Sequence, residues 1–150
     1  MSGYWRKPDE TKAAMVDGWI RTGDAGYMDE GGYVFLVDRI KDMIVTGGEN
    51  VYSTEVENAI ARHPAVSTVV VIGVPSEKWG EAVHAIVMLR AGHSATAEEI
   101  IEHSRKHIAG YKCPRSVEFR TEPLPVSGAG KILKRELRKP YWEGRQSVIA

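Results

Sequence analysis

The chain has 150 residues, 43% of them hydrophobic and 27% charged, and its 20 acidic side chains balance its 20 lysines and arginines. That balance excludes a general electrostatic attraction to nucleic acid, and the one cysteine, Cys113, excludes an internal disulfide framework and a cysteine-built zinc site. The length fits one compact domain with a short appendage. The longest apolar run, residues 69–74, is too short to span a bilayer, and the start has no apolar secretion signal, so we expect a cytoplasmic protein.

The N-terminal third predicts one short helix followed by short strands. The first 18 residues are polar and irregular, and from position 19 short apolar runs alternate with turn residues. A glycine-bearing turn at 29–32 predicts a hairpin. In chain order, the expected elements are a helix at 8–16, strands at 19–27 and 33–37, a charged joint at 38–42, and a strand at 43–46 that ends in Gly47-Gly48.

Two further helices are predicted from one local signal. The pattern Thr-x-x-Glu at 54–57 and at 96–99 fits a capping box, in which two side chains satisfy the first backbone N–H groups of a helix. The β-branched run at 66–74 predicts a central strand. The remaining expected elements are strands at 81–89 and 116–120 and a helix at 132–138. A small mixed sheet flanked by helices belongs to the α+β class.

A glycine-rich loop at 125–131 presents Lys131 just before the last predicted helix. It differs from a phosphate-binding loop, because Pro125 stands where the first glycine belongs and Ile132 replaces the metal-holding Ser or Thr. A lysine at such a fixed and exposed point can still stabilise charge on a phosphate or carboxylate oxygen. The alternative is a plain surface loop.

Other polar residues admit two interpretations each. Asp24 follows a glycine, where a carboxylate either accepts hydrogen bonds from a ribose diol or forms the turn itself. Arg39 and Lys41 are either functional or simply solvated charges of the joint. Gly47-Gly48 either admits a ligand close to the backbone or relieves a positive φ.

Two histidines lie four residues apart on a predicted helix, His103 and His107, with Glu99 one turn earlier. That spacing could make a three-ligand face, but it lacks the His-Glu-x-x-His order of zinc enzymes. Exposed helix faces often carry such residues by chance, and we therefore expect no metal site.

Taken together and in order, these segments resemble the adenylate-forming superfamily of acyl-CoA synthetases, luciferases and peptide-synthetase adenylation domains. The resemblance runs from about Tyr4 to about Arg138. The wording at 47–52, Gly-Gly-Glu-Asn-Val-Tyr, and at 79–81, Trp-Gly-Glu, is most similar to fatty-acyl-CoA ligases.

The resemblance implies roles for individual residues at a nucleotide site. Asp24 and Arg39 match residues that contact the ribose of ATP. Lys131 matches the lysine that bridges carboxylate and phosphate during adenylation. Lys41 matches the hinge about which the C-terminal domain turns, and Glu49 matches a variable polar position near the nucleotide.

It also implies a coenzyme A site. Thr46, Gly47 and Gly48 match the strand that lines the pantetheine tunnel. The remaining candidates for contact with coenzyme A are Trp79, Tyr111 and Lys112. ATP with Mg²⁺ and coenzyme A are then substrates, and we expect none of them tightly bound to this chain.

The resemblance further implies a domain organisation. Residues 1–38 match the edge of a large N-terminal domain, and residues 39–150 match the mobile C-terminal domain with its hinge near 38–42. The phosphate loop and the acyl pocket would lie on the missing N-terminal domain, so we expect a chain that is inactive alone. Its partners would be that domain, a small carboxylic acid or fatty acid, ATP and coenzyme A.

Two alternatives stay open. One is a free-standing interaction module with the same fold and no chemistry. The other is an adenylating enzyme that does not use coenzyme A, luciferase-like or carrier-protein-loading. The joint presence of Asp24, Arg39, Lys41 and Lys131 favours the ligase, because a module without chemistry does not need them all.

Overall fold

A computed structural model describes residues 1–144, so the last six residues of the predicted C-terminal domain, 145–150, lie outside it. The chain divides into two compact units, Met1–Ile40 and Lys41–Ala150. Along its described part, no helix has the length and apolar character needed to cross a membrane.

The first unit consists of one helix and two separate hairpins. The predicted helix is confirmed as α1, Pro8–Ala14, whose proline occupies the first turn. The strand expected at 19–27 is wrong as a single element. It is split because β2, Trp19–Ile20, pairs with β1, Met15–Val16, whereas β3, Asp24–Met28, pairs with β4, Val34–Arg39. Gly23, at φ 78°, turns the chain between the two hairpins.

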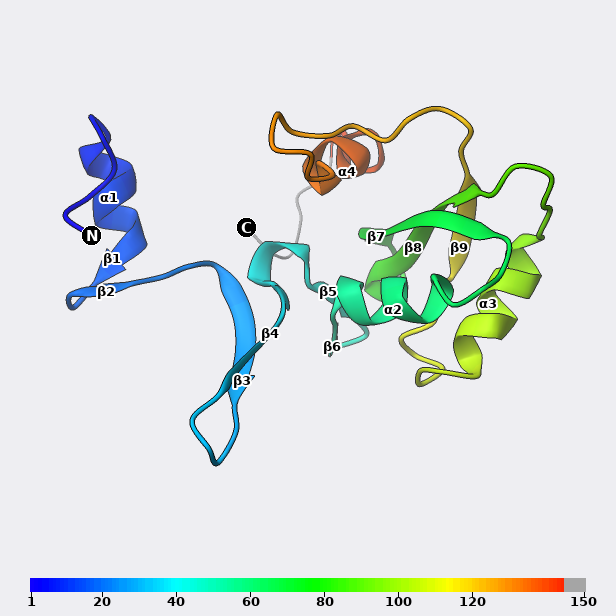
Figure 1. The fold of residues 1–150 in the computed structure, drawn as a ribbon, viewed down its shortest axis with the longest axis horizontal. Helices are drawn as coiled ribbons and strands as arrows, with labels where there is room; N and C mark the ends of the chain where they lie inside the picture. The colour runs from blue at the N-terminus through cyan, green and yellow to red at the C-terminus, as the bar shows by residue number, and fades with distance from the viewer. Residues whose placement is uncertain (145–150) are drawn as a thin grey trace. The chain divides into compact units, whose positions relative to one another are not determined.

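The second unit is a mixed sheet with helices on both faces, which confirms the α+β class (Figure 1). A 3-10 turn, Ile40–Asp42, contains the boundary between the two units. The strands have the order β6-β5-β8-β7, and β9 pairs in parallel with β8. In chain order, its elements are β5 Ile44–Thr46, β6 Glu49–Val51, α2 Ser53–Ile60, β7 Val66–Ser76, β8 Gly80–Leu89, α3 Ala97–Arg105, β9 Ser116–Phe119 and α4 Lys134–Trp142.

The central strand is β8 and not the predicted β7. Strand β8 pairs with β5, β7 and β9, whereas among residues 1–144 β7 pairs only with β8. Strand β7 is nevertheless rich in buried β-branched residues, because helices cover both of its faces. Val71 packs with Val56 and Ile60 of α2, and on the other face Ile72 packs with Leu137 of α4.

The two predicted capping boxes have different outcomes. In α3, the Thr96 hydroxyl accepts from the Glu99 N–H at 3.2 Å and the Glu99 carboxylate accepts from the Thr96 N–H at 2.7 Å, which confirms the box. In α2 the box is wrong. That helix begins after Tyr52 without a side-chain cap, and Glu57 instead accepts the backbone N–H of Val71 at 2.8 Å. Glu57 therefore satisfies an outward-facing N–H of the edge strand β7.

Candidate functional site

The glycine-rich loop before α4 is a tight turn held by its own backbone. The Ser127 N–H donates to the Lys131 carbonyl at 2.7 Å, and the Gly130 N–H donates to the Ser127 carbonyl at 2.8 Å. An isolated bridge joins Val126 to Ile132 and closes the turn. Gly130 has a φ of 76°, which an L side chain rarely adopts. Lys131 is thus exposed on a loop of fixed shape, and its ammonium makes no hydrogen bond or ion pair with any residue from Met1 to Gly144.

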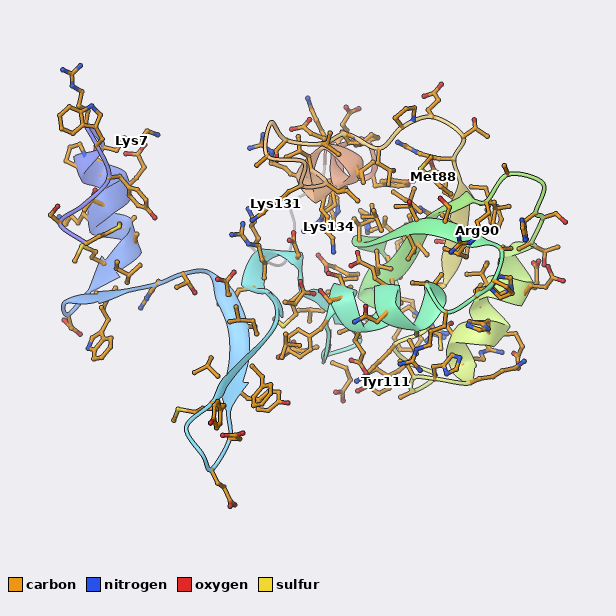
Figure 2. All side chains as sticks on the ribbon, in the orientation of Figure 1. Lys7, Met88, Arg90, Tyr111, Lys131 and Lys134 are labelled. Atoms are coloured by element: carbon orange, nitrogen blue, oxygen red, sulfur yellow. The ribbon has the colours of Figure 1, made fainter. Side chains whose placement is uncertain are left out.

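A second lysine, Lys134, lies three residues later and is bound. Its ammonium donates to the Ser53 hydroxyl at 2.6 Å and pairs with the Glu57 carboxylate at 2.7 Å. These contacts fasten the beginning of α4 to α2, and through Glu57 to strand β7. Figure 2 labels both lysines at the end of the domain where α4 begins, and labels Tyr111 on the opposite side of α2. Lys134 therefore anchors the helix, whereas the Lys131 ammonium stays accessible to a ligand.

The structure brings together the two residues expected to contact a ribose. Asp24 and Arg39 are direct cross-strand partners in the β3–β4 hairpin. The Arg39 Nε lies 3.4 Å from the Asp24 Oδ1, and the Asp24 N–H is held by the Thr22 hydroxyl at 3.2 Å. A carboxylate has about four lone-pair positions, so this ion pair leaves Asp24 able to accept further hydrogen bonds.

Lys41, the expected hinge, lies in the middle of the 3-10 turn Ile40–Asp42, and its side chain is exposed. Its backbone carbonyl accepts a hydrogen bond from the Arg138 guanidinium at 3.1 Å. A short 3-10 segment has poorer hydrogen-bond geometry than an α-helix, and such segments are frequent as connectors.

Gly47 and Gly48 form the two-residue turn between β5 and β6, whose end residues Thr46 and Glu49 are paired. Their φ values of 60° and 86° fit a type I′ turn, for which glycine is favoured. A Cβ on Gly47 would also lie only 2.9 Å from the Trp79 ring. Thr46 is buried beneath the turn, whereas Glu49 is exposed beside it. Gly47 therefore takes a positive φ and also leaves room for the Trp79 ring against its backbone, while the approach of a ligand stays a prediction.

Two cations that sequence reasoning missed lie close to the Trp79 ring. The Lys78 ammonium is 4.7 Å from the Trp79 ring centroid, and the Arg115 guanidinium is 5.5 Å from it. The Trp79 carbonyl accepts the Gly47 N–H at 2.9 Å, which joins this cluster to the glycine turn. Lys78 adjoins Trp79 in sequence, so a basic residue beside an exposed aromatic was an available signal. Arg115 comes from the segment before β9 and gave no such signal.

Tyr111 and Lys112, the other expected contacts for coenzyme A, form a separate group. The Lys112 ammonium donates to both carboxylate oxygens of Glu55, at 2.7 and 2.8 Å, and lies 5.8 Å from the Tyr111 ring centroid. The bond to Glu55 raises the pKa of Lys112 above its usual value and outweighs the opposing effect of burial. Lys112 is therefore a paired cation, whereas the Tyr111 ring is exposed.

Three of the five histidines, His63, His103 and His107, lie beside one another. The His103 ring is 5.0 Å from that of His63 and 4.8 Å from that of His107. Burial and these two neighbours lower the pKa of His103, so its neutral form is favoured. Glu99 does not join them, because its carboxylate caps α3. Within the described chain, no three His, Cys, Asp or Glu side chains are arranged to hold a metal ion.

The family model described as "AMP-binding enzyme C-terminal domain" matches residues 55–131. The long-chain-fatty-acid–CoA ligase of Bacillus subtilis is 50% identical over 137 residues, which cover 91% of this chain and 24% of that protein. The fatty acid–[acyl-carrier-protein] ligase ScoC of Streptomyces coeruleorubidus is 48% identical over 142 residues, covering 95% and 27%.

Two solved structures match nearly the whole chain with the same fold. ATP-bound MatB from Rhodopseudomonas palustris matches with a TM-score of 0.85 and 38% identity, over 96% of this chain and 29% of that one. A fatty acyl CoA synthetase from Mycobacterium tuberculosis matches with a TM-score of 0.70 and 44% identity, over 96% and 28%. The chain thus spans about a quarter of the length of these relatives.

Proposed function

The chain belongs to the AMP-binding enzyme C-terminal domain family, and we propose that it works as the mobile C-terminal part of an ATP-dependent ligase joining a fatty acid to coenzyme A. The observation that carries this proposal is the ammonium of Lys131, exposed on a closed loop while the neighbouring Lys134 is tied down. A free-standing interaction module is not favoured, since the chain resembles ligases along nearly its whole length.

In the first half-reaction, a carboxylate oxygen of the fatty acid attacks the α-phosphorus of ATP and pyrophosphate leaves. Asp24, steadied by Arg39 at 3.4 Å, accepts hydrogen bonds from the ribose hydroxyls. Lys131 enters the site and stabilises the negative charge that develops between carboxylate and phosphate. Mg²⁺ is proposed only as the counter-ion that accompanies the ATP phosphates.

In the second half-reaction, the sulfur of coenzyme A attacks the acyl carbonyl and AMP leaves. The glycine turn lets the pantetheine chain run close to the backbone, because no side chain projects from Gly47 or Gly48. The cations Lys78 and Arg115 can bind the phosphates of coenzyme A, and the Trp79 ring beside them can stack on its adenine. Tyr111 offers a further exposed ring on which the adenine can stack.

Lys131 and Tyr111 lie on opposite sides of α2 (Figure 2). One body therefore carries two functional faces, and rotation about Lys41 would present them in turn to one site. Such a hinge switch lets a single pocket carry out two half-reactions with different requirements.

The test is to follow the two half-reactions separately in the complete ligase. Lys131→Ala should slow adenylate formation by about 10²–10³-fold, because one preorganised charge is lost. Thioester formation from a preformed acyl-adenylate should be much less affected. Lys139→Ala, an exposed lysine of α4, is the matched control. A Lys131→Ala enzyme that adenylates normally, or that loses both steps equally, would remove Lys131 from the mechanism.

The acceptor is tested at the other face. Arg115→Ala should raise the KM for coenzyme A and leave adenylate formation unchanged, because Arg115 is proposed to meet only the coenzyme. An unchanged KM, combined with acyl transfer to a carrier protein, would instead favour a carrier-protein-loading enzyme.

A further inference from the structure

A buried ion pair connects α4 with the backbone of the proposed hinge. One nitrogen of the Arg138 guanidinium donates to the Lys41 carbonyl at 3.1 Å, and another donates to the Glu81 carboxylate at 3.3 Å. The Glu81 side chain is 0% exposed and that of Arg138 is 16% exposed. The second Glu81 oxygen accepts the Val45 N–H at 3.2 Å. Three segments distant in sequence thus meet at one carboxylate.

The arrangement favours a role in positioning over a role in stability alone. A buried ion pair often contributes little net stability, because both ions lose their hydration. Arginine suits this place because its planar fork holds two acceptors in a fixed relation, which the single ammonium of a lysine does not. Strand β7 also makes room for the carboxylate, since a Cβ on Gly73 would lie 2.7 Å from the Glu81 Oε2.

The proposed hinge is anchored on both of its sides, each within its own unit. In the first unit, the Ile40 N–H donates to the Gly23 carbonyl at 2.9 Å. In the second unit, Arg138 holds the carbonyl of Lys41. A peptide group is planar, so fixing that carbonyl also fixes the following N–H of Asp42. Going back along the chain from the second unit, φ and ψ of Lys41 are then the first backbone torsions that this anchor leaves free to rotate.

We propose that Arg138 sets the pivot of the domain rotation, by fastening the peptide after Lys41 to the buried carboxylate of Glu81. This inference rests on the hinge role proposed for Lys41. The same helix begins just after the Lys131 loop, and Val45 leads into the glycine turn, so the two functional faces keep a fixed relation to the pivot. Arg138 is a positioning residue and touches neither substrate nor reacting atoms.

Hydrogen exchange on the 150-residue chain tests the anchor directly. Arg138→Lys keeps a charge opposite Glu81 but cannot hold both acceptors in the same way. Exchange of the Asp42 and Met43 amides should become about 10–100-fold faster, the range for losing one hydrogen bond from a charged donor. Amides of β7 and β8 should be unchanged. Arg135→Lys is the matched control, because Arg135 is 89% exposed on the same helix.

Two further variants keep the test decisive if the buried charge disturbs folding. Arg138→Met combined with Glu81→Gln removes both charges together, and it should show the same local effect at residues 42 and 43. Wild-type exchange at these amides in both Arg138→Lys and the double variant would overturn the proposal. Equal acceleration throughout β7 and β8 would also overturn it, because that result indicates a stabilising role only.

Half-reaction kinetics in the complete ligase supply the functional arm. A pivot that is no longer fixed misplaces both faces, so Arg138→Lys should lower kcat for both half-reactions by up to about 10²-fold with little change in the KM for ATP. Loss of adenylation alone would overturn the pivot role. If the wild-type enzyme formed no adenylate, the proposed function would fail, while the exchange result would still report on the anchor.

Discussion

The two units of this chain hold their side chains in opposite ways. No residue of Met1–Ile40 is buried, and its largest apolar side chains are open, with Trp5 84%, Trp19 79% and Leu36 72% exposed. In the second unit, Ile60, Ile86 and Ile100 are completely buried. The first unit is therefore held by local backbone hydrogen bonds, and the second by apolar packing on both faces of its sheet.

The difference has a simple geometric origin. A two-stranded hairpin presents both of its faces and cannot cover either one by itself, so it is marginally stable in water. The second unit covers each face of its sheet with helices. An open apolar surface of this kind is typical of an interface, and we propose that a large N-terminal domain covers it.

Hydrogen exchange should show the largest difference between the units. Amides of β7 and β8 should exchange only on global unfolding, which costs about 5–15 kcal/mol in typical domains. Amides of β3 and β4 should exchange almost freely, because local opening of a bare hairpin costs little. Uniform protection along the chain would contradict this comparison.

Truncating one apolar side chain in each unit should sharpen the contrast. Ile86→Ala should reduce the free energy of unfolding by about 2–5 kcal/mol, because it leaves a cavity between sheet and helix. Leu36→Ala should change it immeasurably, since that side chain is 72% exposed. Denaturant melts followed by circular dichroism give both values, and similar losses in the two variants would break the comparison.

Ion pairs should follow the same division. Lys134→Met should cost about 1–3 kcal/mol, because the half-buried Glu57 and the buried Ser53 lose a charged partner. Lys7→Met removes the exposed pair with Glu10 at 2.9 Å in the first unit, and should have no measurable effect. Thermal melts of the two variants test this, and a large effect of Lys7→Met would indicate packing in the first unit that the structure lacks.

Mild acid should weaken the second unit, since all five histidines follow residue 62. Burial lowers the pKa of both His84 and His103, so their neutral forms favour folding. This stability is present above the unfolded pKa near 6.5 and declines as the pH falls through it, by at most about 1.4 kcal/mol per pH unit for each histidine.

Melting temperatures measured between pH 7.5 and 5.5 should therefore decrease. Replacing both residues, His84→Gln and His103→Gln, should flatten the profile. A profile that stays equally steep in the double variant would assign the pH effect to other groups.

Local sequence patterns predicted what depends on neighbours in the chain. The two predicted capping boxes show where prediction from local sequence stops being sufficient. Thr96 and Glu99 complete their box, whereas Glu57 carries the same pattern and bonds Val71 and Lys134 instead. Both segments have the pattern Thr-x-x-Glu, so the difference comes from their tertiary surroundings. A half-buried carboxylate beside an unpaired strand N–H and a lysine gains more there than at a solvated helix end.

The sequence by itself determined the α+β class, most element positions and the exposed lysine on a glycine loop, because these follow from periodicity, turn residues and short spacings. Tertiary structure decided that β8 is central and that Arg115 lies beside Trp79. It also decided that Lys134 is bound, whereas the Lys131 ammonium has no partner among residues 1–144. It also decided that Arg138 reaches Lys41, 97 residues away. Such contacts depend on where the folded sheet brings distant segments together, and a local sequence pattern cannot predict which distant residues will lie beside it.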